Sequence, residues 1–242
     1  MEKWARAKYQ PCLPLGEDGR RLTGSKEHIA LSKEAAKEGM VLLKNERQTL
    51  PFSDGTKLAL FGRATFDYVK GGGGSGDVTV AYVRNLYEGL SLQKDKVSLF
   101  EPLCDFYREN VKEQYGAGAE PGRTVEPELP QELLADARKY TDTAVISICR
   151  FSGEMEDRKD EDFYLTEQEK AMVDKVTAAF PKVAVVLNVG GIVDTTWIAE
   201  DEGVSAALLA WQGGMEGGLA AAELLVGKGN PSGKLSDTFA AK

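Results

Sequence analysis

The spacing of apolar residues changes along the chain, and each spacing predicts an element. In residues 26–45 apolar side chains recur every three or four positions, which predicts a helix with Ser25 as its N-cap. Short apolar runs, typical of buried strands, occupy residues 57–62, 96–100, 143–149, 182–188 and 204–210. Helical patterns alternate with these runs, at residues 82–90, 103–115, 131–140, 167–179, 193–199 and 215–226. Thr166 and Glu169 form the capping-box pattern at the start of one of these helices.

Apolar strands that alternate with helices are typical of a mostly parallel sheet covered by helices on both faces. The segment KLSDTF, residues 234–239, is predicted to pair antiparallel at the sheet edge. The predicted fold class is therefore α/β, a three-layer α/β/α sandwich with a mostly parallel sheet of about five to six strands and an antiparallel edge strand. We predict one domain over residues 25–242, after a lead-in segment at residues 1–24.

Composition and charge narrow the classes of function. The 242-residue chain has a net charge of −8 and no run of lysine or arginine, which argues against a nucleic-acid surface. No apolar stretch approaches the roughly 18–20 residues that span a bilayer, and the N-terminus lacks the apolar region of a secretory signal. Cys12, Cys104 and Cys149 are far apart, which favours a reducing, cytoplasmic location. His28 is the only histidine, so we predict neither a metal site nor a Ser-His-Asp triad, and no cofactor.

One loop is unusually rich in glycine. Residues 69–78, VKGGGGSGDV, contain the G-x-G-x-x-G spacing of dinucleotide-binding loops at Gly71, Gly73 and Gly76. The preceding strand ends too early for the tight turn of that motif, and no lysine closes the loop as in a Walker A sequence. A flexible hinge is the alternative without a ligand. Ser75 is the one hydrogen-bonding side chain among the glycines, which favours a contact loop for a polar ligand.

A second loop, residues 150–165, follows the most apolar strand and is rich in acids. Its sequence is RFSGEMEDRKDEDFYL, and it lacks the pattern of a calcium loop. A solvated charged loop is one interpretation. The other is that one carboxylate acts as a general acid, with its pKa raised toward ~6 by a partly apolar pocket. Because both loops follow strands of the predicted sheet, we expect both at its ligand-binding rim.

Several motifs, taken in order, resemble glycoside hydrolase family 3, specifically its α/β sandwich domain. They are EAAKEGMVLLKNERQTLPF, then KLALFG with GGGGSGDV, then SGEMEDRKDEDFYLTEQE, and finally VVLNVGGIVDTTWI with LLAWQGGMEGGLAAAELLVGKGNPSGKLSDTF. The resemblance extends over nearly the whole chain, from about residue 25 to residue 239.

The resemblance implies an exo-acting retaining β-glycosidase, similar to a β-glucosidase, that removes terminal non-reducing β-D-glucosyl residues. Such enzymes use two carboxyl groups about 5–5.5 Å apart, a nucleophile and an acid/base. In the family the nucleophile is an aspartate of a separate (β/α)8 barrel domain. The expected partners are therefore that barrel and a β-glucoside or oligosaccharide substrate. By the same resemblance Glu154 is the acid/base and Ser75 contacts the sugar, and this chain alone is expected to be inactive.

The SGE motif departs from the family pattern at Met155, and Glu156 adds a second acid. Glu156 is thus the rival for the acid/base role, whereas Asp157 and Arg158 are interpreted as residues that order the loop. Two other functions stay open, a carbohydrate-binding or interaction domain without chemistry, and a nucleotide-binding α/β domain. The order of domains in some family members, with the sandwich first, suggests that the chain is a fragment of a longer enzyme.

Overall fold

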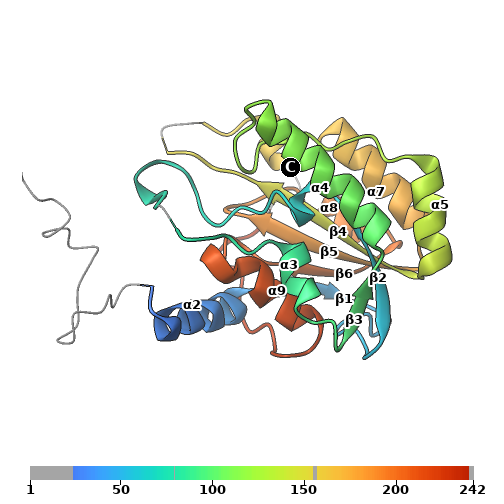
Figure 1. Ribbon diagram of the computed structural model, residues 1–242, viewed down its shortest axis with the longest axis horizontal. Helices are drawn as coiled ribbons and strands as arrows, with labels where there is room; N and C mark the ends of the chain where they lie inside the picture. Colours follow the sequence, from blue (N-terminus) through green and yellow to red (C-terminus); the bar gives the residue numbers. More distant parts are fainter. Residues whose placement is uncertain (1–23, 79, 155–156, 240–242) are drawn as a thin grey trace, which may run out of the picture.

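The computed structural model describes residues 24–78, 80–154 and 157–239, and its described part is built around one six-stranded sheet (Figure 1). The strand order is β1-β6-β5-β4-β2-β3. The strands are β1 (Val41–Asn45), β2 (Thr56–Phe61), β3 (Val97–Leu99), β4 (Thr143–Arg150), β5 (Lys182–Val189) and β6 (Val204–Leu209). Neighbouring strands are parallel except for β1, which pairs antiparallel with β6.

Helices cover both faces of the sheet, which gives the three layers predicted from the sequence (Figure 1). One face packs against α4 (Glu101–Gly116), α5 (Gln131–Tyr140), α7 (Glu167–Ala179) and α8 (Thr196–Glu200). The other packs against α2 (Lys26–Gly39), α3 (Leu86–Ser91) and α9 (Gly217–Leu225). The short elements are α6 (Asp160–Phe163) and the 3₁₀ turns η1 (Arg63–Thr65), η2 (Gly74–Gly76) and η3 (Gly214–Glu216). The predicted fold class is confirmed.

The central strands are buried on both faces because their side chains alternate between two apolar cores. Ile146 of β4 belongs to the core under α4, α5 and α7, whereas its neighbour Val145 belongs to the core under α3 and α9. Every residue of β4 is buried. A parallel strand between two helical layers needs this near-continuous apolar sequence, which is why it was recognisable.

The antiparallel edge strand is a different segment from the one predicted. The helix expected over residues 26–45 ends at Gly39, and Val41–Asn45 forms β1 instead, with Val41 opposite Leu209 of β6. Residues 234–239 contain no strand, so that assignment was wrong. The apolar spacing in the run MVLLKN is compatible with both a helix and a strand. The open hydrogen-bonding edge of β6 selects the extended conformation, a tertiary effect that outweighs local pattern.

Two predicted helix starts are confirmed by their caps. The Ser25 side chain accepts a hydrogen bond from the backbone N–H of His28, and Thr166 with Glu169 forms a complete capping box at α7. The helix predicted from residue 82 begins only at Leu86. The predicted lead-in at residues 1–24 lies almost wholly outside the described residues.

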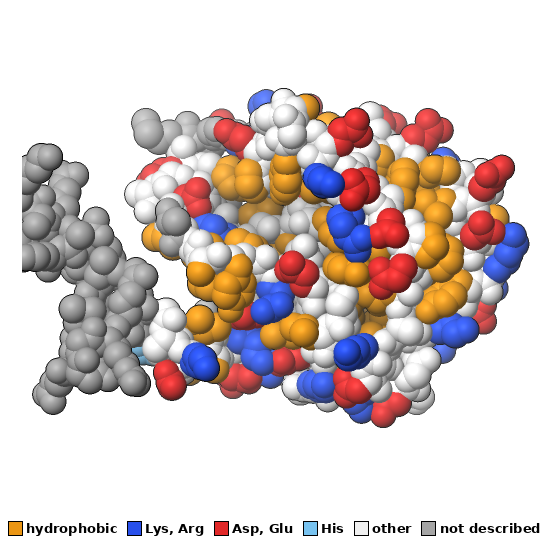
Figure 2. Space-filling model, viewed as in Figure 1, with side chains coloured by type: hydrophobic (Ala, Val, Ile, Leu, Met, Phe, Trp, Pro, Cys, Tyr) orange, Lys and Arg blue, Asp and Glu red, His pale blue; other side chains and the backbone are white. Residues whose placement is uncertain are grey.

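The parallel strands β2, β4, β5 and β6 all end at the edge of the sheet from which the glycine loop, residues 69–78, projects (Figure 1). On the face seen in Figure 2, basic and acidic side chains are interspersed and no patch of one sign forms. Among the helices in the described ranges, none has the length and apolar character to cross a bilayer.

Candidate functional site

The two loops singled out in the sequence meet at the carboxyl-end rim of the sheet. The backbone N–H of Ser75 donates to Oε2 of Glu154 at 2.7 Å, and the Ser75 hydroxyl donates to Oε1 at 3.1 Å. The N–H of Gly73 donates to the carbonyl oxygen of Ser152 at 2.9 Å. Ser75 and Glu154 are both exposed. The structure therefore brings the two predicted site residues into direct contact, on loops 79 positions apart in the sequence.

Two glycines allow this close approach. A Cβ atom at Gly74 would lie 2.2 Å from Cβ of Glu154 and 2.4 Å from its Oε2, and the φ of +85° is one that L side chains rarely adopt. A Cβ atom at Gly73 would lie 2.7 Å from Cζ of Phe151. At Gly71 and Gly76 an added Cβ would meet nothing within 4 Å. The glycine requirement is therefore confined to the positions that face the acidic loop.

The electrostatics of Glu154 differ from the sequence-based expectation. The backbone N–H and then the hydroxyl of Ser75 hold the pKa of Glu154 below its ordinary value, because both donors stabilise the carboxylate. Because the carboxyl group is exposed, no apolar pocket raises its pKa in this chain, and the raised pKa expected for a general acid stays a prediction for the complete enzyme. Glu154 is thus a carboxylate at neutral pH here.

Arg158 ties the acidic loop to the neighbouring segment after β5. Its guanidinium donates to the carbonyl oxygens of Ile192 and Asp162, each at 2.6 Å. Asp157 accepts from the backbone N–H of Arg158 at 2.9 Å. These contacts fit the loop-ordering role expected for the pair. Glu156, the rival acid, lies outside the described residues.

A buried ion pair lies beneath this rim, and the sequence analysis did not anticipate it. Arg150 at the end of β4 and Glu169 in the first turn of α7 are only 7% and 2% exposed. Two guanidinium nitrogens of Arg150 donate to the two oxygens of Glu169, at 2.8 and 2.7 Å. The available signal was an arginine that closes an otherwise apolar strand, since a long cationic side chain there needs an acid nearby.

Asp67 and Glu126 extend the buried charge. Asp67 is 0% exposed and accepts hydrogen bonds from the Arg63 guanidinium, Gly122 N–H, Thr124 N–H and hydroxyl, and Tyr115 hydroxyl. Glu126 is 3% exposed, and one of its oxygens accepts from the backbone N–H of Arg63 at 2.8 Å. Burial raises the pKa of Glu126 to about 7. Asp67 and Glu126 therefore anchor the loop before α5 beneath the rim. Charged residues in loops are normally predicted to be exposed to solvent, so this role could not be predicted from the sequence.

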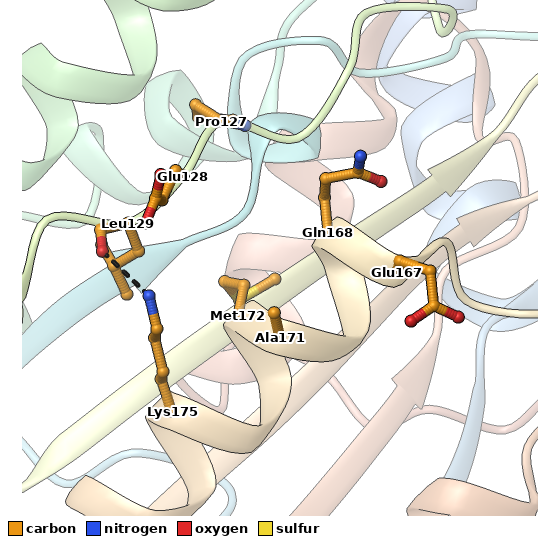
Figure 3. Close-up of a pocket in the computed structure, with 8 residues that line it drawn as sticks. All are labelled: Pro127, Glu128, Leu129, Glu167, Gln168, Ala171, Met172 and Lys175. Carbon is orange, nitrogen blue, oxygen red and sulfur yellow. Dashed lines mark hydrogen bonds between the residues drawn. The ribbon is translucent and has the colours of Figure 1, made fainter.

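The pocket shown in Figure 3 lies away from the contact between Ser75 and Glu154. A shallow pocket of about 290 Å³ lies between residues 127–129 and α7, and Figure 3 shows Lys175 donating to the carbonyl oxygen of Leu129 across it. It contains neither Ser75 nor Glu154. In the described ranges, no three His, Cys, Asp or Glu side chains are grouped so as to hold a metal ion.

The profile of the Glycosyl hydrolase family 3 C-terminal domain matches residues 40–242. The chain belongs to this family. This confirms the resemblance stated from the sequence motifs, and with it the α/β sandwich fold. The glycine loop and the acidic loop are both within the matched range.

Relatives of this family 3 domain include much longer proteins. Beta-glucosidase A of Butyrivibrio fibrisolvens is 57% identical over 266 residues, which cover 100% of this chain and 32% of that protein. The Beta-glucosidase of Ruminococcus albus is 38% identical over 222 residues, covering 88% of this chain and 23% of that protein. The chain therefore spans a third or less of the length of these relatives.

Solved structures agree with this family 3 assignment. A beta-glucosidase from Paenibacillus barengoltzii superposes with a TM-score of 0.83 at 36% identity, covering 90% of this chain and 24% of that one. Beta-glucosidase 3B from Thermotoga neapolitana, in complex with α-D-glucose, gives a TM-score of 0.81 at 35% identity, covering 92% and 32% of the two chains.

Proposed function

We propose that this family 3 C-terminal domain, residues 25–242, supplies the general acid/base Glu154 to a retaining, exo-acting β-glycosidase. The enzyme would hydrolyse terminal non-reducing β-D-glucosyl residues, as a β-glucosidase does. The observation that carries the proposal is the contact of Ser75 with Glu154, on two loops at the rim where such sheets bind ligands. The names of the relatives support the substrate class.

The proposal assigns the nucleophile to a barrel domain outside this chain. Retaining hydrolysis needs a second carboxyl group about 5–5.5 Å from the acid/base. In the described part of the chain, the hydrogen-bond partner given for the Glu154 side chain is Ser75, which is not a carboxyl group. The domain by itself is therefore expected to lack turnover.

Docking of that barrel would also supply what Glu154 needs in order to act as an acid. A second domain and a bound sugar would displace water from the exposed carboxyl group, and desolvation raises the pKa of an acid. The Ser75 hydroxyl can then turn to the sugar, which is the contact proposed for this side chain, while the backbone N–H of Ser75 stays on Glu154.

The test is Glu154→Ala in the complete enzyme. A disaccharide has a poor leaving group that must be protonated, so its hydrolysis should fall by about 10²–10⁴-fold. An activated aryl glucoside should lose much less in the first step, and azide should accelerate the second step by attacking the glycosyl-enzyme directly. Steady-state rates with both substrates, with and without azide, measure these effects.

Glu156→Ala is the matched comparison for this experiment. It should show neither the dependence on leaving group nor the rescue by azide. Exchange of these behaviours between the two variants would assign the acid/base role to Glu156. If neither variant lowered the rate of hydrolysis, a carbohydrate-binding domain without chemistry would be favoured.

A further inference from the structure

Phe151 is the first residue after β4, and its side chain separates two loops. A Cβ atom at Gly73 would lie 2.7 Å from Cζ of the ring, and one at Gly122 would lie 2.9 Å from Cβ of Phe151. The guanidinium of Arg123 stacks over the ring, 4.9 Å from its centroid. The ring is thus enclosed between the glycine loop and the segment that contains Gly122, and both contribute a glycine where they approach it.

The residues packed around the Cβ end of the Phe151 side chain are held by hydrogen bonds to buried side chains. Phe151 packs against a small buried cluster of Ala64, Val69 and Cys149, separate from the two main cores. Gly122 donates its N–H to the fully buried Asp67 at 2.5 Å, and Val69 donates its N–H to the buried Asn188 side chain at 2.6 Å. These backbone bonds to buried side chains hold the two segments against which Phe151 packs.

The glycine loop, by contrast, depends on contacts with the acidic loop. Gly73 bonds to the carbonyl oxygen of Ser152, Ser75 bonds to Glu154, and an exposed ion pair joins Lys70 to Asp77 at its ends. The tip of the Phe151 ring touches this loop at Gly73, two positions from Ser75. The ring tip therefore contacts the loop that carries the donors on Glu154.

We propose that Phe151 is a positioning residue, whose ring sets the separation between the glycine loop and the acidic loop and thereby aligns the Ser75 donors with the Glu154 carboxyl group. This inference deepens the proposed function, and its catalytic consequence rests on the acid/base role of Glu154. The alignment itself is a property of this chain and is testable without activity.

The first experiment is carboxyl-detected NMR of Glu154 in the 242-residue chain. Phe151→Leu keeps apolar bulk in the Ala64, Val69 and Cys149 cluster but removes the ring tip. The loop then loses its support, the Ser75 donors are misaligned, and the pKa of Glu154 should rise toward its ordinary value. The Ser75 amide resonance should move with it. Phe151→Ala should do the same more strongly.

A double-mutant cycle separates positioning from a general loss of structure. Gly73→Ala places a methyl group against the ring and should itself shift the Glu154 titration. In a Phe151→Leu background the same change should add little, because the ring atoms that it would strike are gone. Gly71→Ala is the steric control, since a Cβ there meets nothing within 4 Å. Additive effects in the cycle, or an unchanged Glu154 titration in Phe151→Leu, would overturn the proposal.

The second experiment measures kcat and KM of the complete enzyme. Phe151→Leu should lower kcat for a disaccharide by up to about 10²-fold, the scale of a misplacement near 1 Å, and less for an activated aryl glucoside. If Glu154→Ala behaves as an acid/base variant but Phe151→Leu shows no dependence on leaving group, the positioning proposal fails. If the NMR cycle shows coupling and Glu154→Ala shows no leaving-group dependence, the proposed acid/base role fails instead, and the alignment of the two loops by Phe151 stands.

Discussion

Two carboxylates at the same sheet edge are held in opposite ways. Glu169 is 2% exposed and accepts hydrogen bonds from two nitrogens of Arg150, whereas Glu154 is exposed and accepts hydrogen bonds from Ser75. A buried charge without its partner is costly, so the first pair must stay intact for the chain to fold. Hydrogen bonds to an exposed carboxylate compete with water and can be exchanged for others. The comparison teaches that burial, more than the number of hydrogen bonds, distinguishes an acid that stabilises the fold from one that is free to contact a ligand.

The largest effect is expected on removal of the buried acid. Glu169→Ala removes the carboxylate that pairs with the buried Arg150 guanidinium and also deletes half of the α7 capping box. The free energy of unfolding should fall by about 3–5 kcal/mol. Denaturant titration measures it, with Glu167→Ala on the exposed face of the same helix turn as the control. A loss below about 1 kcal/mol would mean that the pair is not a structural requirement.

A smaller effect, dependent on pH, is expected at Glu126. Its pKa of about 7 in the folded chain lies above the ordinary 4.5, so the folded chain keeps a proton that the unfolded chain has released. The resulting stabilisation is complete below pH 4.5 and disappears as the pH rises through 7. At about 1.4 kcal/mol per pH unit the loss approaches about 3 kcal/mol.

Glu126→Gln should remove this pH dependence while retaining an oxygen that accepts from the Arg63 N–H. Urea titrations of both chains at pH 5 and pH 7.5 test it. Glu128→Gln, an exposed neighbour, should behave like the parent chain. An equal pH dependence in Glu126→Gln and the parent would assign the effect to another group.

The smallest effect is expected at the exposed pair. Ser75→Ala removes the hydroxyl donor but keeps the backbone N–H on Glu154, so the pKa of Glu154 should rise only part of the way to its ordinary value. The unfolding midpoint should not change, because the side chain is exposed. An NMR titration gives the pKa, and Ser152→Ala, a hydroxyl on the acidic loop, is the control. A lowered unfolding midpoint would show that this pair, too, supports the fold.

Local patterns predicted most of the sheet and its layers because parallel strands need long apolar runs. Thr166 with Glu169 also predicted the start of α7, since a capping box is encoded within four residues. The edge strand Val41–Asn45 was missed because its conformation depends on β6, far along the chain. The spacing of apolar residues within a segment carries no information about a partner strand so distant in the sequence.

The sequence predicted the two exposed residues of the site, Ser75 and Glu154, but not the buried acids beneath them. Glycines next to Ser75 and the acidic run around Glu154 are local signals, and parallel topology implied that both loops lie at one rim. The buried roles of Asp67 and Glu126 were not predicted, because both stand in segments whose polarity is typical of solvent-exposed loops. Only the folded arrangement shows that both accept hydrogen bonds from Arg63, Asp67 from its guanidinium and Glu126 from its backbone N–H.

The antiparallel strand β1 has a consequence for synthesis on the ribosome. Val41 pairs with Leu209, 168 positions later, and α2 is joined to α9 through Lys37 and Glu223. At about 5–20 residues per second, residues 26–45 wait on the order of ten to thirty seconds before their partners are made. A product released before β6 would carry a strand without a neighbour, which is a template for aggregation. Synthesis of β6 and α9 is thus what supplies β1 with its neighbouring strand and α2 with its ion-pair partner.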